Sequence, residues 1–451
     1  MMLWTSAEAE AATLGKASKP FAVDGLSIDT RTLREGDLFV ALKGDHRDGH
    51  DFVTAAFDAK AGAALVTHVP DGATGPLLTV AHTQRGLEDL ARAARARSNA
   101  KVIAVTGSAG KTTTKEILRL ACNALGKTHA SAASYNNHWG VPLSLAALPR
   151  DAEYGVFEVG MNHFGELRNL VSFVKPHVAL VTAIAPAHLE FFGNCESIAD
   201  AKSEIFEGLL PGGAALIPSD SDYADRLMQR ARQAQVSRIL RFGREGEAKL
   251  LSFTPDGDGM RVKADILGAA VDCFVGAPGV HIARNVVGAL AAVALLDGDV
   301  LNAAAALKDF TALKGRGARF VADGIHVIDE SYNANPASMA AALALLGAVK
   351  GRKIAVLGDM LEMGEGGIAH HAGLAAPIDA NGTDLVFASG AQMKALWDVL
   401  PAARRGAYAE TAAQLLPLVM AALVPGDTVL VKGSNGAKMS VIVEALGKRG
   451  A

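Results

Sequence analysis

The sequence has few of the features that mark secreted, zinc-binding or nucleic-acid-binding proteins. Its 451 residues include only three cysteines, Cys122, Cys195 and Cys273, which lie far apart and form no CxxC pair. A disulfide framework or a zinc site is therefore not expected, and a reducing compartment fits. Neither sign of charge is in excess, since 44 Lys and Arg against 47 Asp and Glu give a formal net charge of −3. A general binder of nucleic acid or of membrane surfaces would carry a basic excess, so neither partner is expected.

Long apolar runs are also missing. The longest uninterrupted one, 286–296, is too short for a bilayer, which takes about 20 residues. Glu8 and Glu10 precede the first lysine, so the beginning of the sequence lacks the basic start and apolar stretch of a signal peptide. Thr5 and Glu8 instead have the spacing of a capping box at the start of a helix. We therefore expect a soluble, cytoplasmic protein without membrane insertion.

What the sequence does contain is typical of a large α/β protein. Half of its residues are hydrophobic and a fifth are charged, and at roughly 150 residues per domain the length suggests about three domains. Short apolar strands alternate with Ala-rich helical stretches, which favours parallel sheets with crossover helices. We predict domains at 1–98, 99–314 and 315–451, with a patch of short strands at 240–275 around a turn at 255–259.

The most specific motif is VTGSAGKTTT at 105–114. It follows an apolar strand and precedes a helical stretch, which is the setting of a phosphate-binding loop. Lys111 would reach the β- and γ-phosphate oxygens, and Thr112 would ligate Mg²⁺. The backbone N–H groups that would face the phosphates belong to the surrounding residues Gly107, Ser108, Ala109, Gly110 and Thr113. Valine stands where a strict GxxxxGK[ST] motif has its first glycine, and a glycine-rich turn that binds nothing is the alternative.

Other polar residues follow apolar strands or begin helices. Glu158 ends a strand, at the edge where parallel sheets hold their ligands, and is a candidate Mg²⁺ ligand or a solvated carboxylate. His188 and Lys202 also follow a buried strand, but their spacing alone favours ordinary polar residues. His281 and Asn285 are one helical turn apart, so they could hydrogen-bond a purine edge or simply form a polar helix start.

The densest polar cluster is DESYNANP at 329–336, directly after an apolar strand. Asn333 and Asn335 carry both donors and acceptors, which suits a ribose or a small zwitterion. Further along, the adjacent histidines His370 and His371 invite a metal interpretation. Neighbours on a helix point about 100° apart, so one metal site cannot easily use both.

Several motifs, taken in order along the chain, resemble those of the Mur ligases of bacterial cell-wall synthesis. They are TGSAGKTTT, EVGMNHFGEL, the stretch from APAHLE to AKSEIF, HIARN and DESYNANP. SYNANP, LGDMLEMG with its trailing HH, and VLVKGS resemble the branch that adds D-alanyl-D-alanine. Near the N-terminus, SIDTR, GDLFVALKG and DGHDF resemble the family's nucleotide-sugar domain. The resemblance covers essentially the whole chain.

The resemblance implies a three-domain α/β fold and an ATP-dependent amide ligase. An N-terminal domain would bind the UDP-MurNAc-peptide, and a central P-loop ATPase with a mostly parallel sheet would follow. A Rossmann-like C-terminal domain would then close over ATP and receive the dipeptide. ATP, UDP-MurNAc-tripeptide and D-Ala-D-Ala would give UDP-MurNAc-pentapeptide, ADP and phosphate through an acyl phosphate. Two Mg²⁺ ions, a monomer and the bacterial cytoplasm are expected.

The resemblance also assigns roles that spacing alone does not. His188 becomes a ligand of a second Mg²⁺, and Lys202 becomes a carbamylated lysine that supports the same ion. Arg316, with Arg319 as the alternative, becomes the hinge arginine that reaches the phosphates. The nucleotide contacts would come from Asn137, His281, Asn285 and Asp329. Asn333 and Asn335 would lie near ATP and the dipeptide, and the UDP-sugar pocket would include Ser27, Thr30, Arg31 and His50.

Three positions depart from the family pattern, and three other functions remain as alternatives. Glu330, Ala337 and Asn435 stand where the family most often has aspartate, an acidic residue and arginine. One alternative is the family member that adds the third amino acid, whose diaminopimelate-specific form carries a DNPR sequence that is absent here. A folylpolyglutamate synthase would lack the N-terminal nucleotide-sugar motifs. A nucleotide-regulated protein could hydrolyse ATP without ligation.

Overall fold

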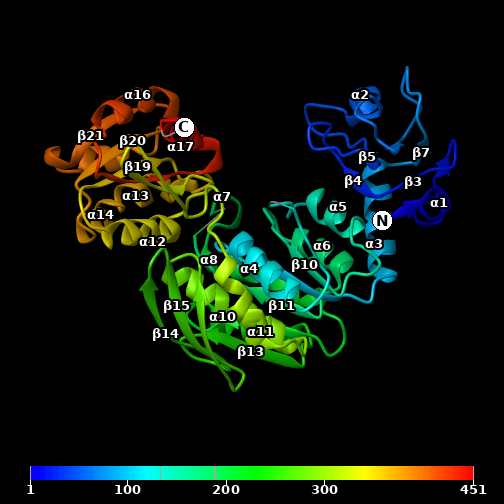
Figure 1. The fold of residues 1–451 in the computed structure, drawn as a ribbon, viewed down its shortest axis with the longest axis horizontal. Helices are drawn as coiled ribbons and strands as arrows, with labels where there is room; N and C mark the ends of the chain where they lie inside the picture. The colour runs from blue at the N-terminus through cyan, green and yellow to red at the C-terminus, as the bar shows by residue number, and fades with distance from the viewer. Residues whose placement is uncertain (1, 133, 187–188, 450–451) are drawn as a thin grey trace.

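The computed structural model describes residues 2–132, 134–186 and 189–449. They form three lobes, each built on its own main sheet (Figure 1). The N-terminal and C-terminal lobes lie at opposite ends of the molecule and the central lobe lies between and below them (Figure 1). The predicted α/β class with mostly parallel sheets is confirmed.

The N-terminal lobe holds a five-stranded sheet in the order β2-β7-β6-β5-β4, parallel except for the β2–β7 pair. Strands β1 and β3 form a separate antiparallel pair. Thr5 and Glu8 form the predicted capping box at the start of the first helix. The elements are β1 (Trp4–Thr5), α1 (Ser6–Thr13), β2 (Lys16–Ala17), β3 (Ala22–Val23), β4 (Gly25–Ser27), β5 (Asp37–Val40), α2 (Val53–Asp58), β6 (Ala63–Val66), β7 (Leu77–Thr79) and α3 (Thr83–Ala96).

The central lobe holds a nine-stranded sheet in the order β16-β15-β14-β13-β12-β11-β8-β10-β9. Strands β8 to β13 run parallel to one another. Strands β14 to β16 form the patch of strands expected at 240–275, and they pair antiparallel with one another. The strands are β8 (Lys101–Thr106), β9 (Thr128–Ala130), β10 (Tyr154–Glu158), β11 (Val178–Val181), β12 (Ala214–Pro218), β13 (Arg238–Gly243), β14 (Ala248–Asp256), β15 (Gly259–Ile266) and β16 (Ala269–Val275). The helices are α4 (Lys111–Asn123), α5 (Gly140–Ala146), α6 (Glu166–Val174), α7 (Leu189–Phe192), α8 (Cys195–Ser203), α9 (Ala224–Gln233), α10 (Val280–Leu295) and α11 (Val300–Ala305).

The C-terminal lobe holds a six-stranded sheet in the order β17-β18-β22-β19-β20-β21, parallel except for the β17–β18 pair. Glu330 and Lys432 are register partners at the ends of β18 and β22, so they reach the same sheet edge. The strands are β17 (Ala318–Ala322), β18 (Ile325–Glu330), β19 (Lys353–Gly358), β20 (Leu385–Ser389), β21 (Arg405–Ala409) and β22 (Thr428–Lys432). The helices are α12 (Pro336–Gly347), α13 (Gly367–Ala372), α14 (Ala375–Ala380), α15 (Lys394–Val399), α16 (Ala412–Ala422) and α17 (Ser440–Lys448).

The hydrophobic cores do not divide the chain in the same way as the sheets. One core contains buried residues of the N-terminal lobe, such as Trp4 and Leu87, together with Val141 and Phe157 of the central lobe. The indole N–H of Trp4 donates to the carbonyl of Ala146 at 3.0 Å, and α3 packs on α5. The two main cores of the C-terminal lobe consist of buried residues from 325 onward. Packing is therefore continuous between the first two lobes, whereas the C-terminal cores have little contact with the central lobe beyond Leu189 of α7 among the described residues.

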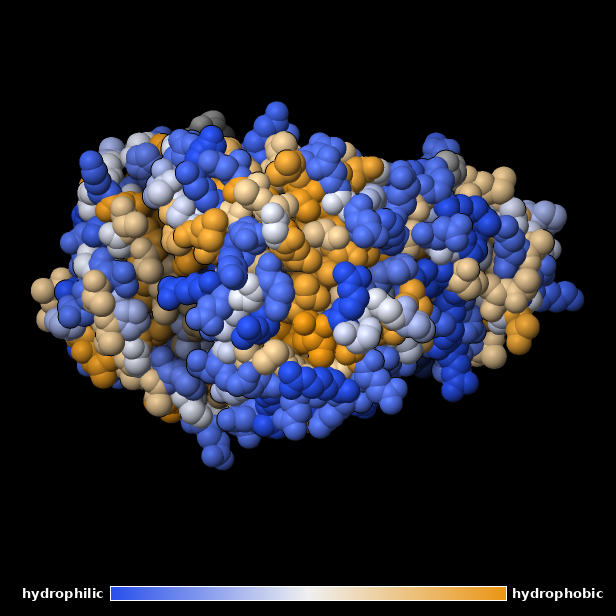
Figure 2. All heavy atoms as spheres, turned by 90° about the horizontal axis from the view of Figure 1, so that it is seen from below, coloured by the Kyte–Doolittle hydropathy of each residue, from blue (hydrophilic) through white to orange (hydrophobic). Residues whose placement is uncertain are grey.

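Figure 2 shows one face of the molecule. Apolar side chains gather at the middle of this face among hydrophilic ones, and both of its ends carry hydrophilic and apolar side chains. Within the described ranges, no helix has the length and apolarity to cross a membrane.

Candidate active site

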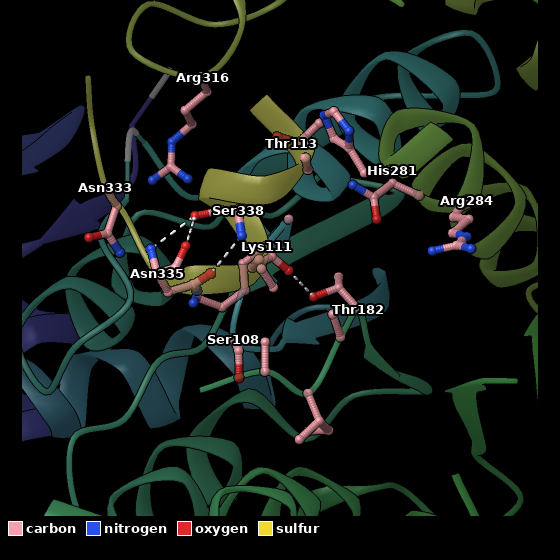
Figure 3. A pocket seen from close by; sticks show the side chains of 18 of the residues that line it. Ser108, Lys111, Thr113, Thr182, His281, Arg284, Arg316, Asn333, Asn335 and Ser338 are labelled. Carbon is pink, nitrogen blue, oxygen red and sulfur yellow. Dashed lines mark hydrogen bonds between the residues drawn. The ribbon is translucent and has the colours of Figure 1, made fainter. Parts of the chain in front are cut away.

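A cavity of about 550 Å³ lies where the central and C-terminal lobes meet. Its walls come from the loop after β8, the ends of β10, β11 and β12, the start of α10, the hinge at 315–316, and the C-terminal lobe. The sequence-predicted residues that line it are Ser108, Ala109, Gly110, Lys111, Thr113, Glu158, His281, Asn285, Arg316, Asn333 and Asn335. In Figure 3, Arg316 and Asn333 lie on one side of Lys111, and His281 and Arg284 lie on the other.

The loop between β8 and α4 has the conformation that the motif predicts. Gly107 and Gly110 have positive φ values of 148° and 81°. A side-chain carbon on Gly107 would lie 2.0 Å from the hydroxyl of Thr182, so the neighbouring strand leaves room only for glycine. That hydroxyl donates to the carbonyl of Ala109 at 2.5 Å and fixes the loop. Helix α4 is 13 residues long, and its N-terminus begins at the cavity, where its N–H groups and dipole favour an anion.

Lys111 is the cation at the base of the loop. Its Nζ donates to the carbonyl of Gly107 at 2.7 Å. Burial lowers its pKa, the negative charge of Glu158 partly offsets this, and the charge of Arg316 adds to the lowering. A partly desolvated cation with a depressed pKa gains most when a dense negative charge, such as a phosphate, binds beside it.

Glu158 and Thr112 are the candidate metal ligands within the described part of the chain. Glu158 is 1% exposed, and its Oε1 accepts a hydrogen bond from Nδ2 of Asn136 at 2.7 Å. Its Oε2 is buried and has no hydrogen-bond partner among the residues that the structure describes. Thr112 is also buried, and its Oγ1 lies 3.2 Å from Oγ of Ser134. A buried carboxylate oxygen without a partner and a buried hydroxyl are both oxygen ligands of the kind that a hard cation prefers.

Lys202 lies on α8 and is almost fully buried. Burial lowers its pKa well below the ordinary value, and the nearby charge of Lys111 adds to the effect. Burial therefore shifts the balance toward the neutral amine at this position. His188, predicted to act beside it, lies outside the described residues.

Helix α10 presents His281 and Asn285 to the cavity, as their one-turn spacing predicts. Burial lowers the pKa of His281, which favours the neutral ring. Nδ2 of Asn285 is buried and finds no acceptor within the described ranges. Arg284, on the same helix, pairs with Asp220 at 2.8 Å at the cavity wall. Open donors and a neutral imidazole suit the hydrogen-bonding edge of a base.

The hinge places Arg316 at the cavity and Asp329 away from it. The Arg316 guanidinium lies 3.8 Å from the ring centre of Tyr332 and donates to Oγ of Ser134 at 3.1 Å. Asp329 is 1% exposed, and its carboxylate accepts hydrogen bonds from the backbone N–H of Gly315 and from the N–H and hydroxyl of Ser331. Asp329 therefore holds the hinge, and its contact with a ribose stays a prediction.

The neighbouring residue Glu330 lines the cavity instead, and so does Lys432. Nζ of Lys432 donates to the carbonyl of Asn333 at 2.8 Å and lies 3.4 Å from Oε2 of Glu330. Asn335 also lines the cavity, and its side chain forms the N-cap of α12 together with Ser338 (Figure 3). Sequence reasoning did not select Glu330 and Lys432 as site residues, although both stand at the ends of apolar strands, and this position was the available signal.

Asn137, predicted as a nucleotide contact, has a structural role in this lobe, and the nucleotide contact stays a prediction. Its Oδ1 accepts hydrogen bonds from the backbone N–H groups of Trp139 and Gly140, so it caps the start of α5. The preceding residue, Asn136, lines the cavity. Because the two asparagines are adjacent and identical, the sequence does not indicate which one caps the helix and which one lines the cavity.

The residues predicted for a UDP-sugar pocket lie in the N-terminal lobe, apart from this cavity. Arg31 is exposed and forms a bidentate pair with Asp29, which lowers the pKa of Asp29 to about 2. Ser27 is buried and donates to the carbonyl of Asp29, and Thr30 follows Asp29 in a turn. His50 is buried, with Nδ1 2.6 Å from the Asp48 carboxylate and Nε2 accepting the N–H of Thr67. Both of its nitrogens are engaged within the lobe, so direct contact with a ligand does not fit this arrangement.

One of the paired histidines of the C-terminal lobe, His371, belongs to the packed interior. His371 is fully buried, its Nε2 accepts the N–H of Met360, and its Nδ1 lies 2.6 Å from the carbonyl of Gly367. Within the described ranges, no group of three or more His, Cys, Asp or Glu side chains is arranged to hold a metal ion.

The fold and the site together define a three-lobed P-loop protein whose phosphate-binding cavity is completed by its C-terminal lobe. Family models match it as "Mur ligase family, catalytic domain" at 22–112, "Mur ligase middle domain" at 105–293 and "Mur ligase, glutamate ligase domain" at 315–435. The chain belongs to the Mur ligase family, and it is a ligase.

Individual relatives agree over nearly the whole chain. UDP-N-acetylmuramoyl-tripeptide–D-alanyl-D-alanine ligase of Rickettsia prowazekii is 32% identical over 447 residues, 98% of this chain and 99% of that protein. The protein of the same name from Escherichia coli is 35% identical over 433 residues, 95% of this chain and 94% of its own length. The crystal structure of MurF from Acinetobacter baumannii covers 99% of both chains with a TM-score of 0.87 and 30% identity. MurF ligase from Thermotoga maritima, solved with ADP, shares the fold with a TM-score of 0.78 over 95% of this chain and 98% of that one, at 24% identity.

Proposed function

We propose that the protein uses ATP to join D-Ala-D-Ala to the tripeptide of UDP-MurNAc-tripeptide, giving UDP-MurNAc-pentapeptide for peptidoglycan synthesis. The observation that carries the proposal is the cavity at which the phosphate-binding loop of the central lobe meets the polar strand ends of the C-terminal lobe. A phosphoryl donor and an amine acceptor can meet there. The names of the relatives with 32–35% identity support the choice of substrates.

The reaction needs ATP because an amine cannot displace oxide from a carboxylate, since oxide is a poor leaving group. A carboxylate oxygen of the tripeptide attacks the γ-phosphorus, the bond to the bridging oxygen breaks, and ADP leaves. The acyl phosphate then accepts the amine of the dipeptide at its carbonyl carbon. Phosphate departs, the nitrogen loses a proton, and the amide remains. Both steps need charge neutralisation and alignment more than covalent help from the protein.

The cavity residues divide this work by charge and by lobe. Lys111 and the N-terminus of α4 hold the phosphates, and Arg316 adds a second cation from the hinge. His281 and Asn285 bind the adenine edge, and Asn333 and Asn335 face the nucleotide and the dipeptide. Ser27, Thr30 and Arg31 belong to the domain of residues 1–98 that we assign to the UDP-sugar, while 99–314 and 315–451 bind ATP and the dipeptide.

Magnesium fits the residues that are present. The open Oε2 of Glu158 and the buried hydroxyl of Thr112 would hold one ion. The ion would neutralise charge on the phosphate oxygens. His188 and Lys202 are proposed for a second ion.

The buried Lys202 supports carbamylation. Its lowered pKa favours the neutral amine, which can attack carbon dioxide to form an N–C bond with loss of one proton. The resulting carbamate is an anion, so a side chain that would repel a metal ion would instead support one.

We further propose a monomeric protein in the bacterial cytoplasm, where ATP and UDP-linked precursors are available. The monomer is supported by the cavity, because one chain supplies its walls from three parts of the fold. Size-exclusion chromatography with light scattering should give about 47 kDa, from the chain mass of 46.6 kDa.

The test is direct. Protein, ATP, Mg²⁺, UDP-MurNAc-tripeptide and D-Ala-D-Ala should yield the pentapeptide by mass spectrometry, with phosphate release that depends on the dipeptide. Parallel reactions with a diaminopimelate and a lysine tripeptide identify the third residue. Phosphate release without the pentapeptide would instead favour a nucleotide-regulated ATPase.

A further inference from the structure

Residues 134–139, here called the linking segment, lie between β9 and α5 and contact all three lobes. Trp139 packs against Gly44 of the N-terminal lobe, where an added side-chain carbon would lie 3.1 Å from the indole ring. The carbonyl of His138 accepts a hydrogen bond from Gln84 of α3 at 2.8 Å. At its other end, Ser134 bonds Arg316 of the hinge at 3.1 Å. The segment is therefore held in place from both sides of the central lobe.

Two side chains of the linking segment reach the two candidate metal ligands. Oγ of Ser134 lies 3.2 Å from Oγ1 of Thr112. Nδ2 of Asn136 donates to Oε1 of Glu158 at 2.7 Å. Asn136 is itself fixed, because its carbonyl accepts the N–H of Gly160 at 2.8 Å, and Gly160 leaves no space for a side chain beside the amide.

These contacts leave a defined set of oxygens for a ligand. Asn136 occupies Oε1 of Glu158, and Oε2 remains buried without a partner in the described part of the chain. A buried, open carboxylate oxygen is costly unless a ligand completes it. The contact with Ser134 restricts the rotation of the Thr112 hydroxyl. Thr112 as a whole is only 4% exposed.

We propose that Ser134 and Asn136 are positioning residues that hold Thr112 and Glu158 ready for a divalent cation and thereby set the affinity of the site for that cation. The inference rests on the magnesium site of the proposed function. Groups that hydrogen-bond metal ligands fix their orientation, and loss of one such partner typically weakens metal binding about 10- to 100-fold.

The experiment measures the binding of a cation to the protein and does not depend on formation of the peptide bond. Mn²⁺ is titrated into the full-length protein with ADP present, and free Mn²⁺ is followed by electron paramagnetic resonance. Ser134→Ala and Asn136→Ala should each weaken Mn²⁺ binding about 10- to 100-fold, while ADP affinity in EDTA stays within about twofold. Ser134→Thr, which keeps the hydroxyl, should restore most of the affinity.

Ser131→Ala is the matched control. Ser131 is 2% exposed in the same loop, and its Oγ has no partner among the described residues. Its backbone bonds, from its N–H to the carbonyl of Val156 and from Lys115 to its own carbonyl, do not involve the side chain. This variant should bind Mn²⁺ as the wild type does. The inference is overturned if Ser134→Ala and Asn136→Ala bind Mn²⁺ normally, or if they lose ADP affinity equally in EDTA. Pentapeptide synthesis by the wild type is scored separately, so failure of the proposed function is distinguishable from failure of this inference.

Discussion

Two neighbouring lysines, one half-buried and one buried, show how loss of solvent prepares single residues for chemistry. Lys111 and Lys202 each have a lowered pKa, burial is the main cause for both, and the charge of Lys111 adds to the lowering at Lys202. Two free ammonium groups would repel each other at this site. We expect one to be neutralised by a phosphate and the other by conversion to a carbamate.

Replacement of Lys111 by alanine should remove activity and leave the fold intact. The side chain is the loop's own cation for the developing charge on the phosphoryl group, so kcat should fall about a thousandfold or more. Lys249→Ala, on the exposed side of β14, is a control for the loss of a positive charge. Steady-state phosphate release and thermal melting separate chemistry from folding. Near-normal turnover would contradict the assignment of the phosphate-binding loop.

The carbamate at Lys202 can be tested by chemical rescue. Lys202→Ala should be inactive, and a short carboxylic acid such as formate should restore part of the activity, because it returns an anion to the vacated space. Lys111→Ala should show no such rescue. Carbon-13 NMR of the wild type in labelled bicarbonate should show a carbamate signal that is missing from Lys202→Ala. Full activity of Lys202→Ala without additive would refute the role.

At the scale of elements, strand order brings the site together. Strand β8 lies between β10 and β11, so the phosphate-binding loop emerges beside Glu158 on one side and Thr182 on the other. Parallel strands deliver their carboxyl ends to one sheet edge, where such sheets hold ligands. The contact between Thr182 and the carbonyl of Ala109 then fixes the loop against β11.

A side chain on the loop glycine should therefore disturb both stability and nucleotide binding. Gly107→Ala would place a carbon 2.0 Å from the Thr182 hydroxyl and 3.0 Å from the backbone of Ala183, at a φ of 148°. We expect a loss of about 1–3 kcal/mol in the free energy of unfolding and weaker ADP binding. Denaturant unfolding measures the loss of stability, and titration calorimetry measures the weaker binding of ADP.

The control for that prediction is Gly212→Ala. Gly212 also has a positive φ, of 80°, but nothing lies within 4 Å of the added carbon. It should lose some stability, about 1 kcal/mol, with unchanged ADP affinity. Equal effects of the two substitutions on ADP binding would mean that the fit of Gly107 against β11 is not what shapes the loop.

At the scale of the whole molecule, the cores set which parts can fold alone. The N-terminal and central lobes share one core, whereas the C-terminal lobe has its own. A hinge beside Arg316 therefore separates a rigid pair of lobes from a smaller unit. Movement of the C-terminal lobe against that pair costs little core packing, which suits closure over a bound nucleotide.

Fragments should reflect this division. Residues 315–451 should give a soluble fragment with one cooperative thermal transition by circular dichroism. Residues 99–314 should aggregate, because removal of the N-terminal lobe exposes the shared core, and 1–314 should be soluble. A cooperative, soluble 99–314 fragment would show that the sheets, and not the cores, define the folding units.

The sequence by itself determined the features that depend on neighbouring residues along the chain. The order of glycines and threonines after β8 specified the loop, the capping box at Thr5 specified the start of α1, and alternating apolar segments specified the α/β class. These features are local because backbone freedom, caps and burial periodicity are read within a few residues. The family motifs added the chemistry.

Only the tertiary structure decided which of two adjacent polar residues faces the cavity. Asp329 holds the hinge while Glu330 lines the cavity, and Asn137 caps α5 while Asn136 bonds Glu158. Successive side chains of an extended chain point to opposite sides, so the assignment depends on which side the other lobes cover. The link from Ser134 to Thr112 joins residues 22 positions apart. No local pattern encodes it, because it forms only when the loop, the linking segment and the hinge are packed together.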